Sequence, residues 1–80
     1  MTKLIVIADP MQEVKIFELD ETKNISRCIS RLRLPQDSVE FIKNYSESLQ
    51  TPIEVEYKGP ADYVQYFISQ ANQFEFVKAY

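Results

Sequence analysis

Three acidic residues occupy positions from which their carboxylates could bind a metal ion. Asp9 directly follows a run of five apolar residues, and Glu54 and Glu56 alternate with apolar residues in the segment 53–58. Carboxylates that converge on a hard cation such as Mg²⁺ can support metal-assisted phosphoryl transfer. A plainer interpretation assigns Asp9 to an Asp-Pro turn and the two glutamates to the solvated face of a strand. The sequence favours the plainer interpretation, so we expect no resident metal or cofactor and, on balance, no enzyme.

Other kinds of catalytic site find little support. The chain has no histidine, one cysteine (Cys28) and one glycine (Gly59), which excludes a His/Cys zinc site and a glycine-rich phosphate loop. Strand alternation groups Cys28 with Leu32 and Leu34, which predicts a small buried apolar side chain. A lone cysteine favours a reducing compartment, and the first apolar run is too short to span a membrane. We therefore expect a cytoplasmic protein with no membrane partner.

Three arginines share one face of the segment 25–34 if that segment is a regular strand: Arg27, Arg31 and Arg33. Such a basic stripe could hold phosphates or an acidic partner surface. Alternatively, the arginines pair across the hairpin with Glu13 and Glu18. The chain has 9 basic and 12 acidic residues, a net charge of −3. This balance favours the cross-strand pairs and does not favour nucleic acid as a partner.

A small mixed sheet is predicted to position these side chains. Apolar runs and alternation predict strands at 3–8, 13–19, 25–34 and 53–58. Residues 74–77 are either a short fifth strand, which we favour, or a continuation of the second helix. Three-to-four residue spacing predicts one helix from Pro35 to the Thr51-Pro52 pair and another from Pro60 to Asn72-Gln73. The predicted fold is a single α+β domain over residues 1–80. It has a three-stranded antiparallel meander, then α-β-α, with a mixed four- or five-stranded sheet and two helices.

The segment 4–10, Leu-Ile-Val-Ile-Ala-Asp-Pro followed by a strand, resembles the opening hairpin of the RNase H-like family. That family includes resolvase-type nucleases and the halves of actin-like ATPases, and the predicted topology is similar over most of the chain. The helical crossover and the two-sided apolar character of the first strand predict that this strand lies near the centre of the sheet. The resemblance implies a nuclease or nucleic-acid-binding protein that depends on Mg²⁺ or Mn²⁺. Asp9 would be its first metal-binding carboxylate and Glu54 or Glu56 its second. The chain departs from the pattern at Met11, where the family often has glycine, and no residue matches the late acidic ligand.

Apolar residues exceed what two helices can cover. The first strand is apolar on both sides, and the second places Phe17 and Leu19 opposite to Val14 and Ile16. If both helices pack on one face of the sheet, the other face exposes an apolar patch, which usually marks an interface. Tyr63 and Tyr66 in the second helix are further candidates because tyrosine is enriched at interfaces.

The leading functional hypothesis is therefore a non-enzymatic interaction or regulatory module that dimerises or docks on a larger protein. One alternative is the reduced metal-dependent nuclease that the resemblance implies. Another is an acidic inhibitor of a nucleic-acid-binding enzyme, supported by the net charge and by dispersed acidic residues: Asp20, Glu21, Glu54, Glu56 and Asp62.

Overall fold

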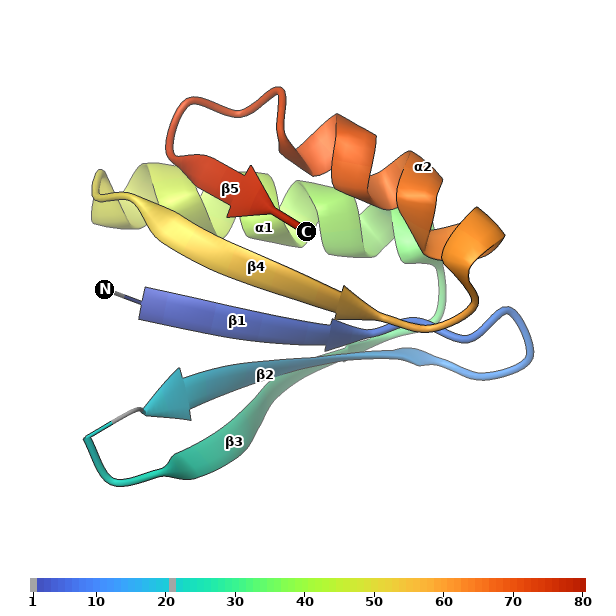
Figure 1. The fold of residues 1–80 in the computed structure, drawn as a ribbon, viewed down its shortest axis with the longest axis horizontal. Helices are drawn as coiled ribbons and strands as arrows, with labels where there is room; N and C mark the ends of the chain where they lie inside the picture. Colours follow the sequence, from blue (N-terminus) through green and yellow to red (C-terminus); the bar gives the residue numbers. More distant parts are fainter. Residues whose placement is uncertain (1, 21) are drawn as a thin grey trace.

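The computed structural model describes residues 2–20 and 22–80, so Glu21, one of the dispersed acidic positions, lies outside the described residues. The described chain forms β1 (Thr2–Ile7), β2 (Val14–Asp20), β3 (Ile25–Leu32), α1 (Pro35–Leu49), β4 (Ile53–Lys58), α2 (Ala61–Ala71) and β5 (Val77–Ala79) (Figure 1). The predicted α+β element order is confirmed. Strand β4 begins and ends at the residues that the alternation of apolar and polar side chains predicted.

The five strands of the described chain form one mixed sheet in the order β3-β2-β1-β4-β5. The hairpin partners β1 and β2 are antiparallel, as are β2 and β3, whereas β4 is parallel to both β1 and β5. The meander and the central position of β1 are as predicted. In the register, Ile5 lies between Phe17 on β2 and Glu56 on β4.

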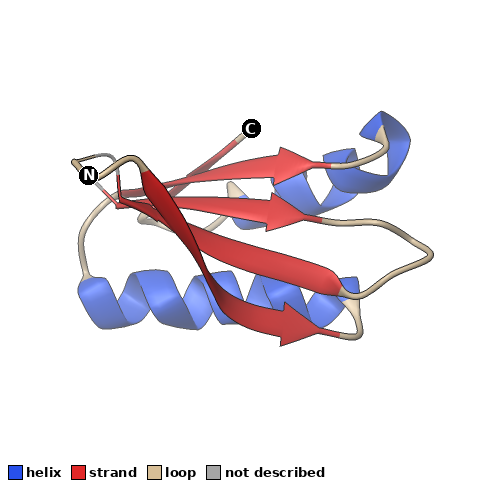
Figure 2. Ribbon diagram, turned by 90° about the horizontal axis from the view of Figure 1, so that it is seen from below, coloured by secondary structure: helices blue, strands red, loops and turns tan. Residues whose placement is uncertain are grey.

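Both helices lie on one face of the sheet. The connections through α1 and through α2 each join parallel strands, and both move across the sheet in the same direction. Because such crossovers are almost always right-handed, two that move in the same direction place their helices on the same face. Figure 2 shows the strands from the uncovered side, with α2 partly behind them.

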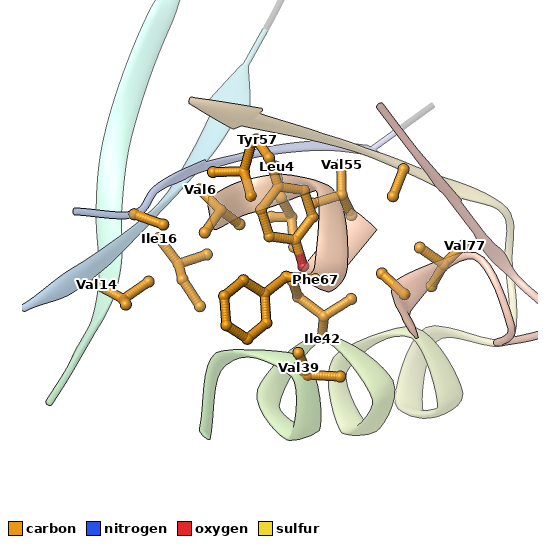
Figure 3. Packing of buried hydrophobic residues seen from close by; sticks show 14 of the residues in the cluster. Leu4, Val6, Val14, Ile16, Val39, Ile42, Val55, Tyr57, Phe67 and Val77 are labelled. Carbon is orange, nitrogen blue, oxygen red and sulfur yellow. The ribbon is translucent and has the colours of Figure 1, made fainter. Parts of the chain in front are cut away.

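The hydrophobic core fills the space between this face of the sheet and the helices. Leu4 and Val6 of β1 and Ile16 of β2 are fully buried there, and Ile42 of α1 meets them from the helical side (Figure 3). Helix α1 begins with Pro35 in its first turn, where the missing N–H costs no hydrogen bond. Its N-cap is Leu34, and no side chain forms a capping hydrogen bond there.

Strand β1 is buried on one face only. Leu4 and Val6 are fully enclosed, but Ile5 on the other face is partly exposed and Ile7 is 41% exposed. Strand β1 is apolar on both sides, as the sequence shows, but the single chain covers only one of them. The reason is the one-sided placement of the helices.

The fifth strand begins later than the sequence predicted. It starts at Val77 because the residues before it form turns, in which the amide of Phe74 donates to Ala71 and that of Val77 donates to Phe74. Phe74 packs against the core from this turn. In the sequence, an aromatic residue that is buried from a turn cannot be distinguished from an aromatic residue that is buried from a strand.

Tyr57 carries the one polar side-chain atom that the described chain buries without a hydrogen-bond partner. The residue is 7% exposed on the core face of β4, and its hydroxyl points toward Phe67 (Figure 3). An unpaired buried hydroxyl costs about 1–3 kcal/mol. Burial also raises the pKa of Tyr57 well above its usual value of 10.

The variant Tyr57→Phe is therefore expected to be more stable than the wild type by about 1 kcal/mol at pH 7. The difference in stability should widen above pH 10. There the Tyr57 phenol ionises in the unfolded wild type but stays protonated in the folded protein, which lowers the free energy of unfolding of the wild type and leaves that of the variant unchanged. Thermal melts at pH 7 and at higher pH measure both effects. A variant that melts below the wild type at both pH values would contradict this account.

Candidate protein-interaction surface on the uncovered sheet face

The face of the sheet opposite to the helices is called here the open face. The register of the strands identifies its residues, because residues directly opposite one another in a sheet share a face. They are Lys3, Ile5 and Ile7 of β1, Lys15, Phe17 and Leu19 of β2, Ser26, Cys28 and Arg31 of β3, Glu54, Glu56 and Lys58 of β4, and Lys78 of β5.

Four of these residues, Ile5, Ile7, Phe17 and Leu19, form a contiguous apolar stripe. Ile5 lies opposite Phe17, while Leu19 lies one row towards the start of β1 and Ile7 one row towards its end. The apolar stripe thus crosses β2 and β1 obliquely. All four side chains retain some exposure, and no helix of the described chain covers them. The predicted interface candidates Phe17 and Leu19 both belong to it.

A β-bulge decides what β3 contributes to the open face. The register with β2 shifts between Ile16 and Phe17, so that Ile16 pairs with Ser30 and Phe17 with Cys28. The inserted residue, Ile29, packs against the core. Cys28 is consequently exposed on the open face beside Phe17. Its predicted burial with Leu32 is wrong, because the bulge interrupts the alternation on which that prediction rested.

The same bulge separates the three arginines that the sequence placed on one face. Arg27 lies opposite Glu18 on the helical side of the sheet, whereas Arg31 lies opposite Lys15 on the open face. The alternative of a single basic stripe is therefore wrong, whereas the cross-strand pairs that the sequence favoured are formed by Arg27 and Arg31. Arg33 follows β3 and is exposed.

Two of these arginines form ion pairs across the β2–β3 hairpin. The guanidinium of Arg27 lies 3.1 Å from Glu18 Oε1, and that of Arg31 lies 3.7 Å from Glu13 Oε1. The Tyr45 hydroxyl of α1 donates a hydrogen bond to the other oxygen of Glu18. Partial burial and this hydrogen bond together raise the pKa of Tyr45 to about 12. Glu18 thus links the β2–β3 hairpin to α1 through Tyr45.

Charged residues flank the apolar stripe on both of its sides. Glu54 and Glu56 lie beside it on β4, and Lys15 and Arg31 lie on β2 and β3. Glu54 accepts a hydrogen bond of 3.4 Å from the hydroxyl of Tyr80. The open face therefore has an apolar centre, a basic side on β2 and β3, and a side of mixed charge on which Lys3, Lys58 and Lys78 accompany the two glutamates.

The structure keeps the candidate catalytic carboxylates apart. Asp9 Oδ1 accepts a hydrogen bond of 2.8 Å from the amide of Met11, as in the turn interpretation. Glu56 lies opposite Ile5, four residues before Asp9, which is about 13 Å along the strand direction. Across residues 2–20 and 22–80, no three His, Cys, Asp or Glu side chains are grouped so that they could hold a metal ion.

Tyr63 and Tyr66 lie on α2 and thus on the helical side of the sheet, away from the apolar stripe. Tyr63 packs edge-on against Phe67 with ring centres 5.4 Å apart and is partly buried. The exposed Tyr66 accepts a hydrogen bond from the Gln70 side chain at 2.8 Å. These two tyrosines cannot contribute to the same surface as Phe17.

The sequence prediction missed Ile5, Ile7 and Cys28 as residues of the surface. The signal for the two isoleucines was present, because their odd positions alternate with the buried Leu4 and Val6. No signal revealed Cys28, since its orientation depends on the bulge.

Comparisons of the chain with protein-family models, curated proteins and solved structures gave no match. Within the described part of the chain, no helix has the length and apolar character needed to cross a membrane.

Proposed function

We propose that this protein is a non-enzymatic interaction module that binds another protein through its open face. The observation that carries the proposal is the apolar stripe, which crosses the two central strands with no helix over it. Soluble proteins usually keep contiguous apolar surface for binding. Full burial of an exposed isoleucine or phenylalanine contributes about 1.5–3 kcal/mol. The four stripe residues are already partly buried, so each can contribute a fraction of this value to association.

The shape of the surface restricts the partner. A sheet face accepts a second sheet at a spacing of about 10 Å, with interdigitated side chains. The centre of the open face would be desolvated in such a complex, while the charged residues on β4 and at the β2–β3 end would form its polar rim. A protein surface with an apolar centre fits this pattern.

We also infer that the framework is RNase H-like in topology. The central β1, the antiparallel meander of β1–β3 and the helical crossovers to the parallel strands β4 and β5 support this inference. No observation favours nuclease activity, because Asp9 is engaged in its turn and lies far from Glu56. The acidic-inhibitor alternative also gains no support, because its acidic residues do not share one surface: Glu54 of β4 lies on the open face, whereas Asp62 lies in α2 on the helical side of the sheet.

The single cysteine provides a test of the proposal that does not require the partner to be identified. Cys28 lies beside Phe17 on the open face and is exposed in the isolated chain. We expect N-ethylmaleimide to modify it at least about tenfold more slowly in a concentrated extract of the source cell than in dilute purified protein. The reaction of Cys28 in protein unfolded by urea gives the reference rate for an unprotected thiol. Equal rates in extract and in dilute solution would contradict the proposed function.

A further inference from the structure

We propose that the partner at the open face is an acidic protein, which covers Ile7 with an apolar group and places carboxylates on the cations beside it. The inference rests on the proposed function and specifies the chemistry of the partner. It derives from the basic character of the open face and from the row of cations that crosses this face at Ile7.

The open face is basic, although the chain as a whole is acidic. Five of the 9 basic residues lie on this face, but only two of the 12 acidic residues do. A second copy packed against the same face would therefore bring five cations against five. An acidic surface would instead be attracted, and complementary charge speeds the encounter of two proteins and excludes wrong partners.

Three of the five cations form one row, called here the cationic row: Lys15, Arg31 and Lys58. Lys15 and Lys58 lie opposite Ile7 on its two sides, and Arg31 lies beyond Lys15. At about 4.8 Å between strands, the row extends over about 14 Å. A partner that covers Ile7 must therefore meet a cation on each side of it.

The cations at the other end of the open face are compensated within the chain. Glu54 lies between Lys3 on β1 and Lys78 on β5, so opposite charges face each other across the strands. The ammonium group of Lys3 also lies 5.7 Å from the centre of the Tyr80 ring. This end of the face therefore attracts anions less than the cationic row does.

The cationic row lacks such compensation. Among residues 2–20 and 22–80, neither Lys15 nor Lys58 forms an ion pair. The pair between Arg31 and Glu13 is 3.7 Å long, and the Arg31 side chain remains 64% exposed, so this pair is weak. Lys15 lies directly opposite Arg31, and like charges in this position destabilise a sheet. Carboxylates of a partner would relieve this repulsion on binding.

The surroundings of the cationic row favour a protein over nucleic acid or an anionic membrane. Three of the four residues of the apolar stripe are aliphatic, whereas single-stranded nucleic acid stacks its bases on aromatic rings. Glu56 lies opposite Ile5, one row from Ile7, where it would repel a continuous layer of phosphate groups. A protein can place carboxylates at the cationic row and a neutral or basic group at Glu56.

The protection of Cys28 from N-ethylmaleimide tests the inference in extract of the source cell that has been treated with nuclease and cleared of membranes. For each variant, protection is the modification rate in dilute purified protein divided by the rate in this extract. We expect Lys15→Glu and Lys58→Glu each to weaken the affinity at least about tenfold, which lowers a tenfold protection to about twofold or less.

Two variants are controls for charge and position. Lys15→Arg keeps the charge of the cationic row, and Lys43→Glu makes the same charge reversal on the exposed side of α1, so both should keep the wild-type protection. Lys15→Glu also places opposite charges across from each other at Arg31. It should therefore melt at or above the wild-type temperature, which separates lost binding from lost folding.

Wild-type protection that persists in both charge-reversal variants would overturn the inference and leave the proposed function standing. So would concentrated purified chain whose Cys28 is as protected as in extract, because the partner would then be a second copy. Protection that disappears after nuclease treatment or removal of membranes would overturn the inference and the proposed function together. Absence of protection in untreated extract would also reject both.

Discussion

Replacement of Gly59 by alanine is expected to remove most of the stability of this protein. Gly59 follows β4 with φ of +154°, a conformation that other residues rarely adopt. A Cβ atom here would lie 2.1 Å from the carbonyl oxygen of Ala8 and 3.0 Å from Val64 Cγ1. The Ala8 carbonyl cannot easily retreat, because the amide of the same residue donates to Lys58 at 2.9 Å and ties β1 to β4.

The expected loss is about 3 kcal/mol or more, from backbone strain and the forced displacement of a central strand. A domain of this size has a total stability near the low end of about 5–15 kcal/mol, so the variant should retain about 2 kcal/mol or less at 25 °C. Urea denaturation followed by circular dichroism measures this loss. Lys58→Ala, at the neighbouring exposed position, is the control and should cost less than about 1 kcal/mol. Equal midpoints for Gly59→Ala and the wild type would contradict the assigned geometry.

The sequence predicted an element correctly wherever its local pattern and the tertiary packing favour the same secondary structure. Alternation in residues 53–58 predicted β4 to the residue, and Pro35 and Pro52 marked the limits of α1. The apolar character of β1 predicted its central place in the sheet. The limits of β5 could not be predicted because Phe74 is packed against the core from a turn, and burial alone does not distinguish the two states.

The surface was predictable only in part, for a reason that lies in β3. Phe17 and Leu19 follow from the alternation within β2, which the hairpin keeps regular. The orientation of Arg27 and Cys28 depends on the single residue inserted at the bulge, which reverses the faces of the strand on one side of it. Nothing local in the sequence marks that insertion. A prediction of which arginines share a face therefore needed the register between the strands.

The second large effect is expected from Ile7→Lys, which places a charge in the apolar stripe. Ile7 is 41% exposed, so the free energy of unfolding should change by less than about 1 kcal/mol. In a complex, by contrast, the stripe is desolvated, and a lysine there would cost about 2 kcal/mol or more, which is roughly a 30-fold loss of affinity. Ile25→Lys is the matched control. Ile25 is 56% exposed and lies opposite Asp20 on the other face of the sheet.

The central claim, that the open face binds protein, is tested most directly by the size of the complex that these two variants form. Tagged wild type, Ile7→Lys and Ile25→Lys are each expressed in the source cell, and concentrated native extracts are separated by gel filtration. We predict that the wild type and Ile25→Lys elute in a complex larger than the 9.4 kDa chain, whereas Ile7→Lys elutes as the folded monomer. Elution of Ile7→Lys with the wild type, or elution of all three as monomers, would contradict the claim.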